Sequence, residues 1–137
     1  MPHGEGSAAW LREHGHVELA PVVANHPVTC LADAGFGNGR WAGFESLEAA
    51  VVAYADKRAR QRLLPMDERF AIWRRKYRVA PAGSGKAWSE ERLAEIRARA
   101  DWLETVVCRL AGVDPAQVER LRWTARALVS ARNGERL

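Results

Sequence analysis

Cysteine and long apolar stretches are scarce in this chain of 137 residues. Its two cysteines, Cys30 and Cys108, lie far apart and belong to neither a CxxC pair nor a Cys/His cluster. This spacing argues against a disulfide framework or a structural zinc site, and we expect two buried thiols. No apolar run is long enough to cross a bilayer, and the first five residues lack the basic-then-apolar order of a secretory signal. A cytoplasmic location without membrane association is therefore expected.

The chain also lacks strand patterns and complete nucleotide-binding motifs. The GFGNG sequence at 35–39 precedes no strand-turn-helix unit, so it is expected to form a flexible or substrate-lining loop. The GSGK sequence at 83–86 lacks the first glycine of a phosphate loop and a following Ser or Thr, which leaves it as a linker. The predicted fold class is all-α.

Charged residues are plentiful, with 21 Lys and Arg against 17 Asp and Glu and a net charge of +4. Clustered cations are typical of proteins that bind phosphate polyanions. Between residues 90 and 101, however, arginines alternate with acids as on a solvated helix face. The charge therefore allows a nucleic-acid partner but does not favour one.

Helical periodicity accounts for the N-terminal quarter of the chain. A short helix is predicted over 7–13, with Gly15 as its stop. Apolar residues at helical spacing predict a second helix over 19–26, which Pro27 should end. His26 would close the apolar face of that second helix, so its side chain should point inward.

The middle of the chain predicts a central helix. Ser46 is a suitable cap, and residues 47–54 are apolar on nearly every side, so this helix should be the most buried element, Val51 included. Its basic continuation should remain helical as far as Pro65. Another helix is predicted over 67–77.

The C-terminal third predicts a helical hairpin. Apolar residues recur at alternating steps of three and four along 89–132, with Gly112 between the two expected helices. Ser89 should cap the first of these helices and Gly112 should stop it, and Asp114 should cap the second. We therefore divide the chain into a helical domain at 1–78, a linker at 79–88 and a two-helix antiparallel hairpin at 89–137.

Three side chains are candidate metal ligands: His3, His26 and Asp56. The helical neighbours of Asp56 are small and apolar, so its carboxylate should lie near the core, where it needs a partner, and close to His26 in a common cavity. Imidazole and carboxylate bind divalent metals that activate water. In the structural alternative, His26 is a hydrogen-bonded helix-end histidine, Asp56 pairs with Lys57 or Arg60, and His3 belongs to a frayed terminus.

Two segments carry a family resemblance. HGEGSAAWLREHGHVELAPVVANHP at 3–27 and SLEAAVVAYADKRARQRLLPMDERFAIWRRKY at 46–77 resemble the later part of bacterial HD-superfamily metal-dependent phosphohydrolase domains. In that family a histidine precedes a small-residue helix, a second histidine ends the next helix, and an ADKR-like segment supplies the last metal-binding aspartate. The matching residues here are His3, His26 and Asp56.

The resemblance implies a partial HD-like helical bundle with a divalent metal such as manganese, iron or magnesium. Its activity would be hydrolysis of a nucleotide or another phosphate ester, with Lys57 and Arg58 stabilising the negative charge that develops on the phosphate. The alternative for these two cations is a solvated helix face.

The chain departs from the family because it contains no His-Asp pair. HD proteins place an early histidine and the HD dyad before the region matched here, so a fragment, a misplaced start or a natural remnant is expected. The ligand set would be incomplete and metal-dependent hydrolysis weak. Apolar surface around Trp10, Val22 and Val52 should be exposed and covered by a second copy or a partner chain. The competing function is a non-catalytic helical module that binds a partner.

Overall fold

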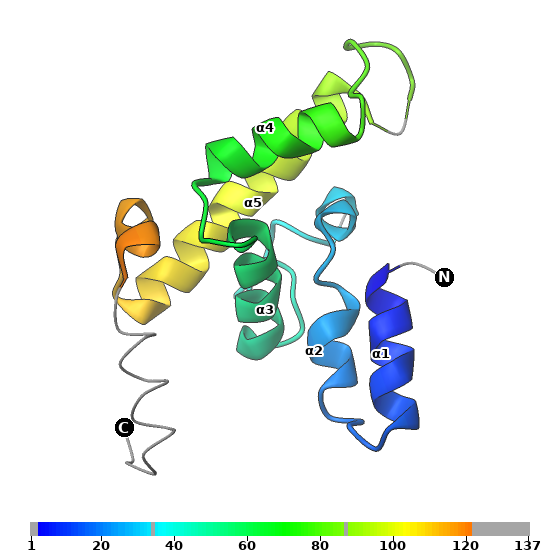
Figure 1. Cartoon of the computed structure of the whole chain (residues 1–137), viewed down its shortest axis with the longest axis vertical. Helices are drawn as coiled ribbons and strands as arrows, with labels where there is room; N and C mark the ends of the chain where they lie inside the picture. The colour runs from blue at the N-terminus through cyan, green and yellow to red at the C-terminus, as the bar shows by residue number, and fades with distance from the viewer. Residues whose placement is uncertain (1–2, 34, 87, 122–137) are drawn as a thin grey trace.

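The computed structural model describes residues 3–33, 35–86 and 88–121, and every regular element in these ranges is a helix (Figure 1). This confirms the predicted all-α class. The α-helices are α1 (His3–Glu13), α2 (Ala20–Ala24), α3 (Leu47–Arg58), α4 (Met66–Lys76) and α5 (Glu90–Ala111), and the 3-10 helices are η1 (Val28–Ala32) and η2 (Pro115–Arg120).

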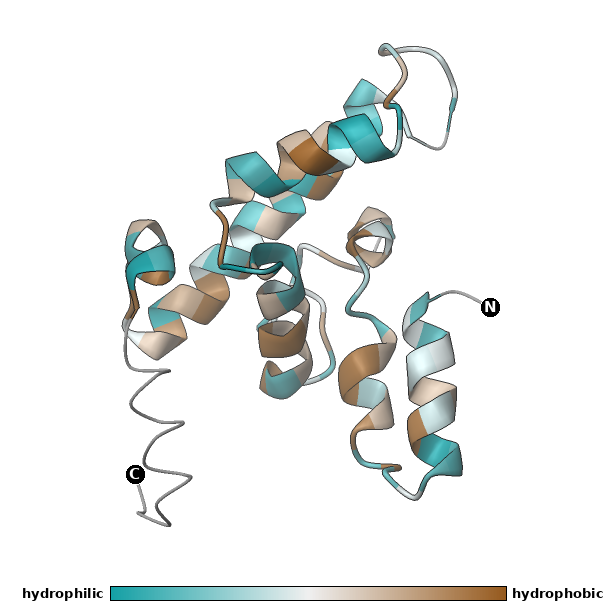
Figure 2. Ribbon diagram, in the orientation of Figure 1, coloured by the Kyte–Doolittle hydropathy of each residue, from teal (hydrophilic) through white to brown (hydrophobic). Residues whose placement is uncertain are grey.

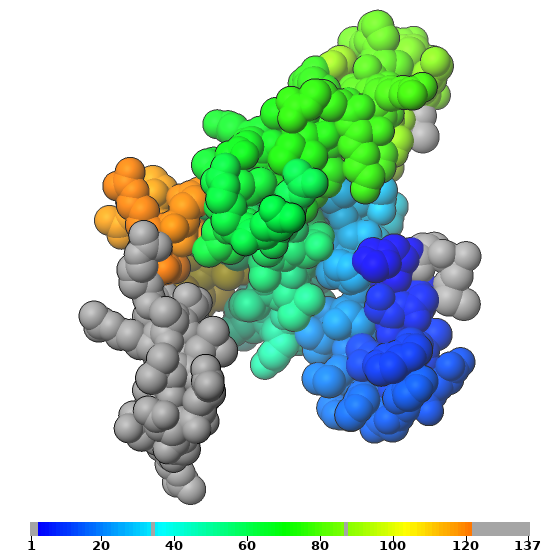
Figure 3. Space-filling model, viewed as in Figure 1, coloured from blue at the N-terminus to red at the C-terminus, as the bar shows by residue number. Residues whose placement is uncertain are grey.

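The helices pack in successive pairs. α1 lies antiparallel to α2, α2 packs against α3, and α3 packs against α5, which also carries α4, η1 and η2 (Figure 1). A small core of Ala8, Ala20 and Ala24 joins α1 to α2. A larger core includes Leu31, Phe70 and residues of α3 and α5. Figure 3 shows the α1–α2 pair, in blue, as a lobe beside α3.

Local capping explains where α3 and α5 begin. The Ser46 hydroxyl accepts a hydrogen bond from the Ala49 amide, and the Ser89 hydroxyl accepts one from the Arg92 amide. Such bonds satisfy amides that a helix N-terminus leaves unpaired. α5 ends at Gly112, whose φ of 65° is a left-handed conformation suited to glycine. Both predicted caps and the predicted stop are confirmed.

α2 is shorter than the predicted 19–26 helix. Proline has no amide hydrogen, so Pro27 cannot donate to the carbonyl of Val23. That carbonyl instead accepts from the amide and from the ring Nδ1 of His26. The chain then turns at Pro27 into η1, an element that the sequence pattern did not predict.

α3 ends earlier than predicted. It stops at Arg58, and Ala59 is already extended, with a ψ of 140°. The amide of Leu64 donates to the carbonyl of Arg58, and the Arg58 guanidinium donates to the carbonyl of Leu64. These two bonds hold the 59–64 segment as a tight turn, so the expected continuation to Pro65 was wrong.

One face of α3 lies at the surface. Six of its twelve residues are buried, but Val51 is 43% exposed. The buried side faces α2 and α5, and Val51 lies at the edge of this side, one turn before the buried Tyr54. The predicted burial of Val51 was therefore wrong, although the central position of α3 was right.

The C-terminal hairpin is described only in its first arm. α5 and the Asp114 cap of η2 follow the prediction, but residues 115–120 form a 3-10 helix where an α-helix was expected. The remainder of the predicted second arm, 122–132, lies outside the described residues. The larger core contains residues from before and after the predicted linker at 79–88. The division of the chain into two domains therefore stays a prediction.

Both cysteines are free thiols. The predicted burial is confirmed for Cys108 but was wrong for Cys30, which is partly exposed. Among the helices of the described ranges, none is both long and apolar enough to span a membrane.

Candidate functional site: a cavity at the C-terminal ends of α2 and α3

A cavity of about 610 Å³ brings together the three candidate metal ligands. It lies between the first turn of α1, the segment that follows α2, the end of α3 and one face of α4. His3, His26 and Asp56 all line it, although each comes from a different element. Its other lining side chains include Cys30, Arg69, Trp73, Lys76 and Tyr77.

The two histidines meet edge to face, with ring centroids 5.0 Å apart. The Nδ1 of His26 lies 2.6 Å from the carbonyl oxygen of Val23. A carbonyl only accepts, so Nδ1 carries the proton, and in the neutral ring Nε2 keeps its lone pair. His26 therefore has the second hydrogen bond that orients most metal-binding imidazoles. The same bond is what a structural helix-end histidine makes.

Asp56 is less enclosed than the sequence predicted. Its side chain is 43% exposed, and Oδ2 lies 4.0 Å from the Nζ of Lys57, the outer limit of an ion pair. Within the described ranges, no group of three His, Cys, Asp or Glu side chains is placed to hold a metal ion. The three candidates share a cavity but do not form a complete ligand set.

Lys57 lies behind the cavity wall, fully buried. Its Nζ donates to the backbone carbonyl of His26 at 2.5 Å, which ties α3 to the segment after α2. Burial lowers the pKa of Lys57 to about 8, while the nearby Asp56 carboxylate acts in the opposite direction. The alternative of a solvated helix face was wrong for Lys57, and its contacts show that it positions His26.

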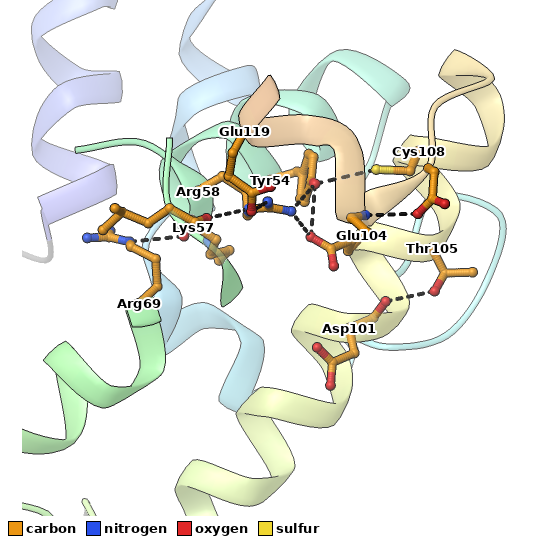
Figure 4. Close-up of polar contacts among 12 residues, drawn as sticks. Tyr54, Lys57, Arg58, Arg69, Asp101, Glu104, Thr105, Cys108 and Glu119 are labelled. Atoms are coloured by element: carbon orange, nitrogen blue, oxygen red, sulfur yellow. Dashed lines mark hydrogen bonds and ion pairs between the residues drawn. The ribbon is translucent and has the colours of Figure 1, made fainter. Parts of the chain in front are cut away.

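Arg58 does not line the cavity. Its buried guanidinium donates to the carbonyl of Leu64 at 2.6 Å and to the hydroxyl of Tyr54 at 2.8 Å. It also forms ion pairs with Glu104 of α5 and Glu119 of η2 (Figure 4). The guanidinium therefore joins α3, α5 and η2. The alternative of a solvated helix face was wrong for Arg58 as well. Arg58 is also absent from the cavity lining, so no contact places it near a substrate there.

Arg69 is a cavity residue that the sequence analysis missed. It is buried, and its guanidinium donates to the backbone carbonyls of Lys57 at 2.9 Å and Asp56 at 3.0 Å. It also lies over the Trp73 ring, 4.6 Å from the centroid. It forms no ion pair with any described residue. Burial lowers its pKa, while the nearby Asp56 carboxylate acts in the opposite direction. The helical spacing of 69, 73, 76 and 77, which places these residues on one face of α4, could have identified it.

Close packing of α1 against α2 positions His3. A Cβ at Gly4 would lie 2.0 Å from the carbonyl oxygen of Ala24 and 2.9 Å from the Cδ of Pro27. Only glycine fits between these backbones without movement. α1 starts at His3 in a regular helix, so the frayed terminus of the structural alternative is not observed.

Gly4→Ala should lower the free energy of unfolding by about 1–3 kcal/mol, because overpacking outweighs the better helix propensity of alanine. Urea unfolding monitored by circular dichroism measures the change. Gly35→Ala is the matched control, because no atom lies within 4 Å of its added Cβ. An unchanged or higher stability of Gly4→Ala would contradict the close approach of α1 and α2.

Comparison with protein-family models, curated proteins and solved structures gives no match to this chain. What the chain does has to be inferred from the cavity itself, which is lined by two imidazoles (His3 and His26), two acidic residues (Glu5 and Asp56) and the buried guanidinium of Arg69.

Proposed function

We propose that this chain contributes part of a metal-dependent phosphohydrolase site of the HD type, on an HD-like helical bundle. The observation that carries the proposal is that His3, His26 and Asp56 line one cavity although they come from three elements. These are the residues that match the family's ligands in the two resembling segments. The substrate class is a phosphate ester, such as a nucleotide.

The cations of the cavity support a phosphate ligand. A buried charge is costly unless a counter-charge compensates it, and Arg69 has only backbone carbonyls as hydrogen-bond acceptors among the described residues. Lys76 lines the same cavity from the next turns of α4. A phosphate group would give Arg69 an anionic hydrogen-bond acceptor, and donors fixed in advance stabilise such a charge without reorganisation.

The ligand set of the described residues is insufficient for a metal ion that activates water. Other ligands have to come from outside these residues, within this protein or from a partner chain. We therefore assign no hydrolytic step to the described part of the chain, and propose that the chain alone has little phosphatase activity.

A non-catalytic helical module that binds a partner is the second candidate function. It is favoured by four large apolar side chains that are exposed on α1, on α3 and in the segment between α1 and α2. These are Trp10, Val17, Leu19 and Val51. A partner that covers this surface would be required by either function.

Titration with Mn²⁺ tests the metal proposal through the four histidines of the chain. The paramagnetic ion should broaden the ring NMR signals of His3 and His26 before those of His14 and His16, which are exposed and outside the cavity. In Asp56→Asn, about ten times more Mn²⁺ should be needed for the same broadening of His3 and His26, because a charged ligand is lost. Turnover of a generic phosphate ester should be negligible.

Equal broadening of all four histidines would contradict a metal site in the cavity. Robust phosphatase activity that survives Asp56→Asn would contradict both the incomplete ligand set and the role assigned to Asp56. The exposed acid Asp33 provides the matched control, because Asp33→Asn removes a carboxylate that does not line the cavity.

A further inference from the structure

A second hollow, a groove of about 490 Å³, lies where α2 and α3 begin. Its apolar wall is formed by Leu19, Pro21, Val22 and Ala49. Leu19 is 45% exposed although it has a large apolar side chain. Figure 2 shows hydrophobic residues on α2 and in the middle of α3, the two helices that flank the groove. An exposed apolar hollow of this kind is typical of a surface that another molecule covers.

The rim of the groove is acidic. Glu18, Glu45 and Glu48 line it, and no lysine or arginine does. None of the three forms an ion pair with a described residue. Three carboxylates without an ion-pair partner among the described residues surround an apolar wall, in a chain whose net charge is +4. The groove therefore selects a ligand that is both apolar and cationic.

We propose that this groove binds a cationic amphipathic helix of another protein chain. The apolar side chains of the helix would contact Leu19 and Val22, and lysines or arginines flanking its apolar stripe would face the three glutamates. In helix-in-groove recognition, the bound helix presents apolar side chains three and four residues apart to an apolar groove. The apolar wall that α2 and α3 form together is a surface on which such a row of side chains can pack. This docking surface stands independently of the metal-site proposal.

The groove and the cavity occupy opposite ends of the same helix pair. The groove is lined by residues at the starts of α2 and α3, and the cavity by residues at their C-terminal ends. Figure 1 shows that the two helices run in the same direction. α3 has 12 residues, which corresponds to about 18 Å. A docked helix of similar length that lay along α3 would therefore extend from the groove to the level of Asp56.

The test uses the full chain and a fluorescein-labelled synthetic helix of about 14 residues, with leucines three and four positions apart and flanking lysines. A second peptide replaces every lysine with glutamate. Fluorescence anisotropy should show binding of the lysine peptide only, and binding should weaken as salt is added. Leu19→Asp should weaken it by at least about tenfold, and Glu45→Gln with Glu48→Gln by about fivefold.

Matched controls change the same residue types on α5. Leu110→Asp alters another exposed leucine, and Glu91→Gln with Glu95→Gln removes two exposed acids outside the groove. Neither should change the affinity. Circular dichroism establishes that each variant keeps its helices.

Three outcomes would overturn the proposal. The first is equal affinity for the lysine and glutamate peptides, which would show that the acidic rim plays no part. The second is equal weakening by the groove and α5 variants. The third is a dimer of the chain that Leu19→Asp dissociates, because the groove would then bind a second copy of this chain.

Discussion

Arg58→Met should lower the free energy of unfolding by about 3–5 kcal/mol, the usual cost of breaking a buried ion pair by removing one partner. The guanidinium is buried and contacts Tyr54, Leu64, Glu104 and Glu119. Methionine fills similar space but leaves both carboxylates without their cation. Such a loss is a large fraction of the total free energy of unfolding of a small domain, which is about 5–15 kcal/mol.

Urea unfolding monitored by circular dichroism measures the loss. Arg62→Met is the control, because Arg62 and Glu68 form an exposed pair, with side chains 66% and 44% exposed. That variant should lose less than about 1 kcal/mol. If Arg58→Met does not fold, Glu119→Gln tests the same network by removing one of its two carboxylates. This variant should lower the free energy of unfolding by about 1–3 kcal/mol. A loss below that of Arg62→Met would contradict the joining role of Arg58.

Lys57 should make the protein more stable as the pH rises from about 8 to 10.5. Its pKa is lowered from 10.5 to about 8 in the folded state, chiefly by burial. Between these two values the unfolded chain binds a proton that the folded chain has released, so the free energy of unfolding rises with pH. The difference between the two pKa values corresponds to about 3 kcal/mol.

The measurement compares the wild type with Lys57→Met at each pH, so that titrations common to both proteins cancel. Both should carry Cys30→Ser, because the Cys30 thiol faces Lys57 and burial raises its pKa above 9.0. Asp56 and Arg69 are the other charged groups that act on Lys57. The stability of the wild type should rise relative to Lys57→Met across this window. A constant difference would show that folding does not lower the pKa of Lys57.

Part of the candidate site could be predicted from the sequence. His26 and Asp56 were expected on inward faces of two different predicted helices, and the structure places both in one cavity with His3. Their neighbours were harder to predict. Lys57 and Arg58 are consecutive basic residues that the charge pattern could not distinguish, yet one bonds the carbonyl of His26 and the other bonds α5 and η2.

The sequence by itself determined the helical class, the caps at Ser46 and Ser89 and the stop at Gly112. The helical class depends on apolar spacing along each segment. The caps and the stop depend on residues within one turn of helix, because capping bonds and left-handed turns involve only near neighbours. The tertiary structure decided that α3 ends at Arg58, that Val51 is exposed and that Arg69 faces the cavity. These outcomes depend on contacts between residues far apart in the chain, where packing and charge burial outweigh local helical preference.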